Sequence, residues 1–195
     1  LGVCRGLQEL NVCLGGSLKT LPEPGSDAPG GEALYHGFPE GPPDVQYGAS
    51  HVMNMEPTGQ LAAIIGGDTL EVPVNSCHKQ GIDRVGLGIA VEGVSPDGVV
   101  EAISVPGAAT FAVAVQWHPE YKPEGNPAAQ RIYEAFGRAC DARRASAPNR
   151  APSQAPQGGL AASVLLNGCF DLLHAGHFNA FRQARALCAE AAGVA

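Results

Sequence analysis

The strongest constraint on the fold is an almost wholly apolar run at residues 111–115, which reads FAVAV. Such a run is expected of a strand buried on both faces of a parallel sheet. The next five residues, QWHPE at 116–120, bring polar groups directly to the end of that strand. We therefore expect a mixed α/β fold with candidate catalytic groups at one edge of its sheet.

Helical patterns lie on both sides of this strand in the sequence. The leucines of residues 7–14 recur at helical spacing and a Gly-Gly pair follows them, which predicts a short helix directly after Cys4. Asn126 and Pro127 supply the N-cap and the first-turn proline of a second helix. An apolar stripe at residues 132–139 continues that second helix.

The middle of the chain has strand and turn signals. Residues 51–55 and 70–74 have the apolar content of strands. Residues 89–105 form two such runs separated by Ser-Pro-Asp-Gly at 95–98, which predicts a β-hairpin. Residues 19–44 are crowded with proline and glycine, so we expect a long surface loop there.

Composition excludes several classes of protein. The net charge of −7 argues against a nucleic-acid partner, and no apolar run approaches the roughly 20 residues of a transmembrane helix. Six cysteines occur without a C-x-x-C pair, so neither a metal site nor a disulfide framework is predicted. We expect a soluble cytoplasmic protein. Because the chain begins at Leu1 without a secretory leader, we interpret it as a fragment.

The chain is expected to divide into three parts. Residues 141–160 are rich in alanine, proline and arginine and have almost no large apolar side chains. Such a segment buries too little surface to offset chain entropy, so it is predicted to be a flexible linker. It separates a domain at 1–140 from a segment at 161–195.

Cys4 is the first candidate nucleophile. Gly2 and Gly6 flank it where a strand is expected to turn into a helix, and small neighbours allow a strained turn and close approach of a substrate. The helix dipole would favour its thiolate. His118 and Glu120 could serve as base and orienting carboxylate. A buried structural cysteine and a His-Pro turn with a solvated glutamate are the alternatives, and spacing leaves them open.

Ordered motifs in residues 1–140 resemble the class I glutamine-amidotransferase-like proteins. These motifs are GVCRGLQELN, ASHVMNME, VNSCHKQGID, SPDGVVEAI and FAVAVQWHPEY. The branch they most resemble is the γ-glutamyl-γ-aminobutyrate hydrolases of putrescine degradation. The resemblance implies an incomplete flavodoxin-like α/β domain. It also implies a catalytic triad of Cys4, His118 and Glu120 that hydrolyses a γ-glutamyl amide through a thioester without a cofactor.

The resemblance also implies a substrate-binding group. Its members are Gln8, Asn75, Ser76, His78 and Gln80. The alternatives are an ordinary helix-surface amide for Gln8 and a turn stabilised by side-chain hydrogen bonds for the other four. Lys79 departs from the pattern, because many relatives carry a second histidine there.

The family's strands before the nucleophile would lie upstream of Leu1, together with a glycine-rich loop that donates an oxyanion-hole amide. Loss of one such donor costs about 100-fold or more in rate. The competing hypothesis is therefore a non-catalytic fragment or a remnant binding module.

The last segment carries a different motif. After an apolar run at 161–166, His174 and His177 share one face of an expected first helical turn, where phosphate is attracted. Zinc binding and a helix cap with exposed histidines are the alternatives.

The run NGCFDLLHAGHFNAFRQARAL resembles the start of ethanolamine-phosphate cytidylyltransferases. This implies a truncated Rossmann-like nucleotidyltransferase fused to the hydrolase, with His174 and His177 as catalytic residues. It implies CTP, with Mg²⁺, and phosphoethanolamine as substrates on the route to phosphatidylethanolamine. The implied nucleotide-binding residues are Gly168, Phe170, Asp171 and Gly176.

Overall fold

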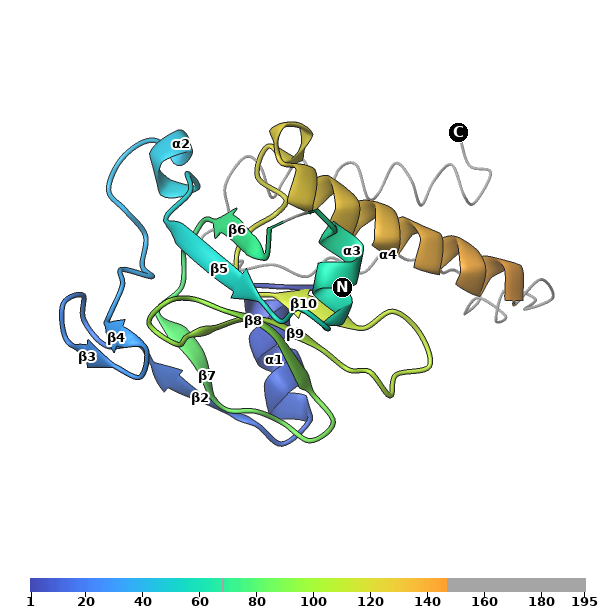
Figure 1. Ribbon diagram of the computed structural model, residues 1–195, viewed down its shortest axis with the longest axis horizontal. Helices are drawn as coiled ribbons and strands as arrows, with labels where there is room; N and C mark the ends of the chain where they lie inside the picture. Colours follow the sequence, from blue (N-terminus) through green and yellow to red (C-terminus); the bar gives the residue numbers. More distant parts are fainter. Residues whose placement is uncertain (68, 147–195) are drawn as a thin grey trace, which may run out of the picture. The chain divides into compact units, whose positions relative to one another are not determined.

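The computed structural model describes residues 1–67 and 69–146. The chain divides into two compact units, Leu1–Asp141 and Ala142–Ala195. The first unit is built on a six-stranded sheet with the strand order β1-β10-β9-β8-β5-β6 (Figure 1). Its strands are β1 (Gly2–Val3), β5 (His51–Met55), β6 (Glu71–Val74), β8 (Ala90–Val94), β9 (Val100–Ser104) and β10 (Val113–Val115).

The sheet is mixed. Strands β1 and β10 are parallel, with Gly2 opposite Ala114 and Val3 opposite Val115. Strand β10 is antiparallel to β9, and the remaining pairs in the sheet are also antiparallel. The expected parallel pairing is therefore found on one side of β10 only. The prediction of a buried strand at 111–115 is confirmed for Val113, Ala114 and Val115, which are all buried, whereas residues 111 and 112 precede the strand and are half-buried.

Helices cover both faces of this sheet. Val113 and Val115 of β10 pack in one hydrophobic cluster, with residues of α3 (Gln60–Ile65) and α4 (Pro127–Ser146). Ala114 lies between them in sequence and packs in a second cluster, with Leu7 of α1 (Arg5–Cys13). Successive side chains of a strand point to opposite faces, so α1 lies on one side of the sheet and α3 and α4 lie on the other.

Several predicted elements are confirmed. Helix α1 ends just before Gly15, which has a φ of 87°. Strands β8 and β9 pair as the predicted hairpin. The Asn126 side-chain oxygen accepts a hydrogen bond of 3.1 Å from the backbone N–H of Ala129, as an N-cap should. Helix α4 continues to Ser146, inside the segment assigned to the linker.

The segment at 19–44 has more structure than its composition predicts. Strand β2 (Ser17–Thr20) pairs with β7 (Gln80–Arg84), and a short hairpin joins β3 (Asp27–Ala28) to β4 (Gly31–Glu32). Two short helical segments lie elsewhere, α2 (Pro43–Gln46) and the 3₁₀ turn η1 (Pro123–Gly125). Strand β7 carries no clear apolar alternation, and its pairing with β2 depends on residues distant in sequence.

In the part of the chain that the structure describes, no helix has the length and apolar character needed to cross a membrane. The residues assigned to a cytidylyltransferase segment lie outside the described residues. These are Gly168, Phe170, Asp171, His174, Gly176 and His177.

Asn11 connects α1 to the β2–β7 pair. Its side chain is completely buried, and its amide nitrogen donates to the backbone carbonyls of Ser17 at 3.2 Å and Arg84 at 3.1 Å. Its amide oxygen accepts a hydrogen bond of 2.8 Å from the backbone N–H of Gly86. One amide thus bonds three backbone groups of two other segments, of which the Gly86 N–H is buried and the two carbonyls are partly buried.

We expect Asn11→Ala to lower the free energy of unfolding by about 1–3 kcal/mol, because it removes three hydrogen bonds and leaves the buried Gly86 N–H without a partner. Urea denaturation measures this loss. Asn11→Asp should cost at least as much near pH 7, since a carboxylate would face two carbonyl oxygens. Its cost should shrink toward acidic pH, where the protonated carboxyl can donate to one of them.

Asn54→Ala is the matched control, because Asn54 is exposed on β5. It should change the free energy of unfolding by no more than about 0.5 kcal/mol. An Asn11→Ala chain as stable as this control would contradict the role of the buried amide.

Candidate functional site

Cys4 occupies a strained position between β1 and α1. Its φ is 48° and its ψ is −101°, a left-handed conformation that residues other than glycine rarely adopt. Neighbouring Gly2 leaves room for this turn, since a Cβ on it would lie 2.8 Å from that of Ala114. Strain of this kind persists only where the surrounding structure imposes it, and it is frequent at reactive groups. The sulfur is thereby presented directly at the start of a helix.

The parallel pairing of β1 and β10 brings the polar segment at 116–120 to Cys4. Residues 3 and 115 lie side by side, and the backbone N–H of Cys4 donates to the carbonyl of Val115 at 2.8 Å. Both strands therefore end at the same edge of the sheet. His118 and Glu120 follow β10 at this edge, although more than a hundred residues separate them from Cys4 in sequence.

His118 and Glu120 are directly paired. Nδ1 of His118 lies 2.6 Å from Oε1 of Glu120, and the imidazole is largely buried while the carboxylate is half exposed. Burial lowers the pKa of His118, but hydrogen bonds and charge from Cys4 and Glu120 outweigh burial and raise that pKa to about 10. His118 is therefore an imidazolium at neutral pH, and its other nitrogen remains for the thiol.

Asn75 fixes the backbone of His118. Its amide oxygen accepts a hydrogen bond of 2.8 Å from the N–H of His118, and its amide nitrogen donates to the His118 carbonyl at 3.0 Å. Both polar ends of the Asn75 side chain are thus engaged by one residue. This pairing gives Asn75 a positioning role that the sequence did not indicate.

Gln116 is a site residue that the sequence analysis did not select. Its side chain is completely buried, and its amide nitrogen lies 3.5 Å from the sulfur of Cys4. Its amide oxygen accepts a hydrogen bond of 3.2 Å from Gln8. The position of Gln116 directly after the buried strand was the available signal, and the same signal selected His118.

Gln8 and Gln80 meet near this edge. The Gln8 amide nitrogen donates to the backbone carbonyl of Gln80 at 2.9 Å, as well as to Gln116. Gln80 itself is exposed. The site therefore receives one side chain from α1, the Gln8 amide, and one backbone carbonyl from β7.

Cys77 is a second thiol near the site with a different environment. It is buried and donates to the backbone carbonyl of Gln46 at 3.2 Å. Burial, followed by the charges of Cys4 and Glu120, raises the pKa of Cys77 to about 11. Cys77 is thus a neutral, unreactive thiol at physiological pH.

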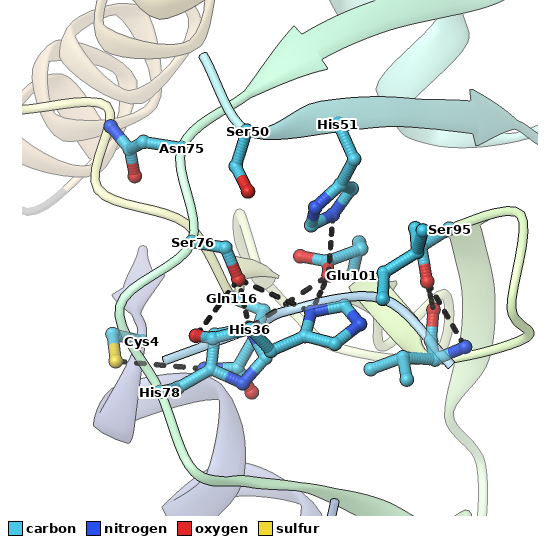
Figure 2. A network of polar contacts seen from close by, with 12 residues as sticks. Cys4, His36, Ser50, His51, Asn75, Ser76, His78, Ser95, Glu101 and Gln116 are labelled. Carbon is cyan, nitrogen blue, oxygen red and sulfur yellow. Dashed lines mark hydrogen bonds and ion pairs between the residues drawn. The ribbon is translucent and has the colours of Figure 1, made fainter. Parts of the chain in front are cut away.

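Ser76 and His78 point away from Cys4 into a buried polar cluster, which also contains His36, His51 and Glu101 (Figure 2). Ser76 Oγ lies 3.1 Å from Nε2 of His78. Burial lowers the pKa of His78 to about 4, so this imidazole is neutral. Of the predicted binding group, Gln8 and Asn75 lie at the Cys4 edge, whereas Ser76 and His78 belong to this cluster.

Comparison with known proteins gives relatives for the first part of the chain. The family model described as Peptidase C26 matches residues 1–120. A gamma-glutamyl-gamma-aminobutyrate hydrolase of Escherichia coli is 41% identical over 141 residues, which are 71% of this chain and 52% of that protein. A Mycobacterium tuberculosis protein, provisionally described as a glutamine amidotransferase, is 40% identical over 123 residues, which are 62% of this chain and 34% of that protein.

The chain spans about half the length of the Escherichia coli relative. A crystal structure of a Thermoplasma acidophilum protein, provisionally described as part of a GMP synthase, has a TM-score of 0.52 at 17% identity. The alignment covers 76% of this chain and 60% of that one, and it shows the α/β class I glutamine-amidotransferase-like fold. These matches give no support for a cytidylyltransferase segment.

We expect Cys4 to be alkylated faster than the exposed Cys13 and Cys140 at pH 6.5, by about 10- to 100-fold, because an unassisted thiol is only about 1% thiolate there. Cys77 should stay unlabelled until the pH approaches 11. Peptide mass spectrometry after timed iodoacetamide exposure measures each rate.

His118→Ala should slow the labelling of Cys4, because the paired imidazolium beside the sulfur is lost. Glu120→Gln should have a smaller effect, since the carboxylate orients and stabilises the imidazolium. Cys13 serves as the internal control in every variant. If the alkylation rate of Cys4 were the same with and without the His118 imidazole, the two residues would not be coupled.

Proposed function

This chain belongs to the peptidase C26 family, and from that premise we propose that it hydrolyses a γ-glutamyl amide with Cys4 as the nucleophile. The observation that carries the proposal is the left-handed Cys4 at a helix N-terminus, beside the His118–Glu120 pair at 2.6 Å. No buried structural cysteine needs either feature. The Escherichia coli relative is named as a gamma-glutamyl-gamma-aminobutyrate hydrolase, and we propose the same substrate for this chain.

In the proposed reaction, the Cys4 thiolate attacks the γ-carbonyl carbon and forms a C–S bond. The His118 imidazolium donates its proton to the departing amine nitrogen as the C–N bond breaks, leaving a γ-glutamyl thioester. Neutral His118 then removes a proton from water, whose oxygen attacks the thioester carbonyl. The C–S bond breaks, glutamate is released, and the thiolate–imidazolium pair is restored.

The surrounding groups have distinct proposed roles. Backbone N–H groups of the first turn of α1 would stabilise the oxyanion, since that helix begins at the nucleophile. Gln8 would contact the glutamyl portion of the substrate from one turn further along α1. Asn75 would act through His118, by holding its backbone while the ring exchanges protons.

A second proposal concerns residues 161–190, where we infer a cytidylyltransferase start from the sequence run NGCFDLLHAGHFNAFRQARAL and its HxGH motif. These residues lie outside the described part of the chain. The competing hypothesis for both segments is a non-catalytic remnant, which the following experiment separates from a working hydrolase site.

We expect a glutamine analogue with a chloromethyl ketone in place of the γ-carboxamide to alkylate Cys4 in the full 195-residue chain. Excess γ-glutamyl-γ-aminobutyrate should slow this modification, because it would occupy the same site. Iodoacetamide labelling of Cys13 should not respond to the competitor. Intact-mass and peptide mass spectrometry measure the site and rate. Modification without protection would indicate a reactive thiol that binds no γ-glutamyl group.

Turnover of γ-glutamyl-γ-aminobutyrate to glutamate should disappear in Cys4→Ser. Asn75→Ala should lower kcat by about 10-fold or more with a smaller change in KM, since Asn75 positions the base instead of binding substrate. Asn75→Asp can still accept a hydrogen bond from the His118 N–H, so its kcat should lie between that of Asn75→Ala and that of the unchanged chain. Turnover that survives Cys4→Ser would remove Cys4 as the nucleophile.

A further inference from the structure

A group of buried titratable side chains takes no part in the chemistry proposed for Cys4. Its members come from four separate segments: His36 precedes α2, His51 opens β5, His78 lies between β6 and β7, and Glu101 lies on β9. All four side chains are at least 95% buried. Figure 2 shows the imidazoles gathered around the Glu101 carboxylate.

His36 and His78 each have one ring nitrogen that is hydrogen-bonded to a group other than Glu101 or Ser76, and these outer hydrogen bonds determine which nitrogens carry protons. Nδ1 of His78 lies 3.0 Å from the carbonyl of Gln80, and a carbonyl can only accept, so this nitrogen carries hydrogen. Nε2 of His36 lies 3.0 Å from the Asp97 carboxylate and donates to it. In the neutral imidazoles, Nδ1 of His36 and Nε2 of His78 are therefore left with lone pairs.

These lone pairs converge on a region that lacks hydrogen atoms to satisfy them. Nδ1 of His36 and Nε2 of His78 lie 3.2 and 3.1 Å from Ser76 Oγ, whose single hydrogen is also within reach of the His36 carbonyl. Oε1 of Glu101 lies 3.6 Å from Nδ1 of His36 and 3.8 Å from Nε2 of His78. Oε2 of Glu101 is buried without a hydrogen-bond partner. A cation would satisfy this excess of acceptors.

The spacing fits a metal ion. The three ligand atoms of His36, His78 and Glu101 all lie within 4.8 Å of one another. A tetrahedral zinc ion holds nitrogen and oxygen ligands at about 2.0–2.2 Å, which sets them about 3.4 Å apart. Bringing the three ligand atoms from their present separations to this spacing needs side-chain movements of about an ångström or less.

The outer hydrogen bonds also match those of metal-binding histidines. Such histidines donate their other ring N–H to a carboxylate or a backbone carbonyl, which fixes the ring and strengthens the ligand. Asp97 does this for His36, and the Gln80 carbonyl does it for His78. His51 donates to Oε1 of Glu101 at 3.1 Å and orients the carboxylate in the same way.

We propose that His36, His78 and Glu101 form a binding site for one divalent transition-metal ion, with zinc as the preferred occupant. Two imidazoles and a carboxylate suit zinc and disfavour calcium or magnesium, which prefer oxygen ligands alone. The ion would tie the segment before α2 and the loop after β6 to strand β9. It would stabilise the fold beneath the Cys4 edge without touching the substrate.

The test uses the full chain with Cys4→Ser, so that the nucleophile cannot bind metal. After treatment with a chelator, the chain should bind one equivalent of Zn²⁺ in calorimetry, and its Tm should rise with added Zn²⁺. Bound Co²⁺ should give visible d–d bands without sulfur-to-metal charge transfer in the near ultraviolet. His78→Gln should weaken binding by at least about 100-fold, and Asp97→Asn by about 10- to 100-fold.

His118→Gln is the matched control, because it removes one imidazole outside the cluster and should leave the affinity unchanged. Near-ultraviolet circular dichroism of the metal-free variants identifies any that fail to fold, in which case Glu101→Gln replaces them. Absence of saturable binding in the Cys4→Ser chain would overturn the proposal and leave a proton as the occupant. Sulfur charge transfer, or affinity insensitive to both His78 and Glu101, would overturn it equally.

Discussion

Parallel pairing between β1 and β10 is the interaction on which the Cys4 edge depends. It sets Val3 beside Val115, so that two strands from opposite ends of the domain finish at one edge of the sheet. Cys4 and Gln116 are then the next residues of their strands, and the hydrogen bond from the Cys4 N–H to Val115 holds the turn. A shift of one residue in this register would turn every following side chain to the other face.

Buried amides perform much of the positioning around this pairing. Asn11 joins α1 to the β2–β7 pair, Asn75 holds the backbone of His118, and Gln116 contacts the sulfur of Cys4. Each amide offers donors and an acceptor at fixed angles without carrying charge. They can therefore be buried at low cost, provided that every polar atom finds a partner.

A continuous series of hydrogen bonds relates the Cys4 edge to the buried cluster of histidines. The Gln80 carbonyl accepts from both His78 and Gln8, Gln8 donates to Gln116, and Gln116 lies against Cys4. The position of β7 thus affects both groups. Ordering of the cluster would accordingly fix the carbonyl that orients Gln8.

Local sequence determined much of this protein. The Gly-Val-Cys-Arg-Gly turn, the Asn126 cap and the Ser-Pro-Asp-Gly hairpin each depend on residues within a few positions of one another, and the structure has all three. The proximity of His118 and Glu120 follows similarly from their separation by one residue. Tertiary structure alone decided which strands pair, and therefore that β10 has only one parallel neighbour. It also decided that His78 turns away from Cys4 toward His36 and Glu101, because these side chains meet only through burial of segments far apart in the chain.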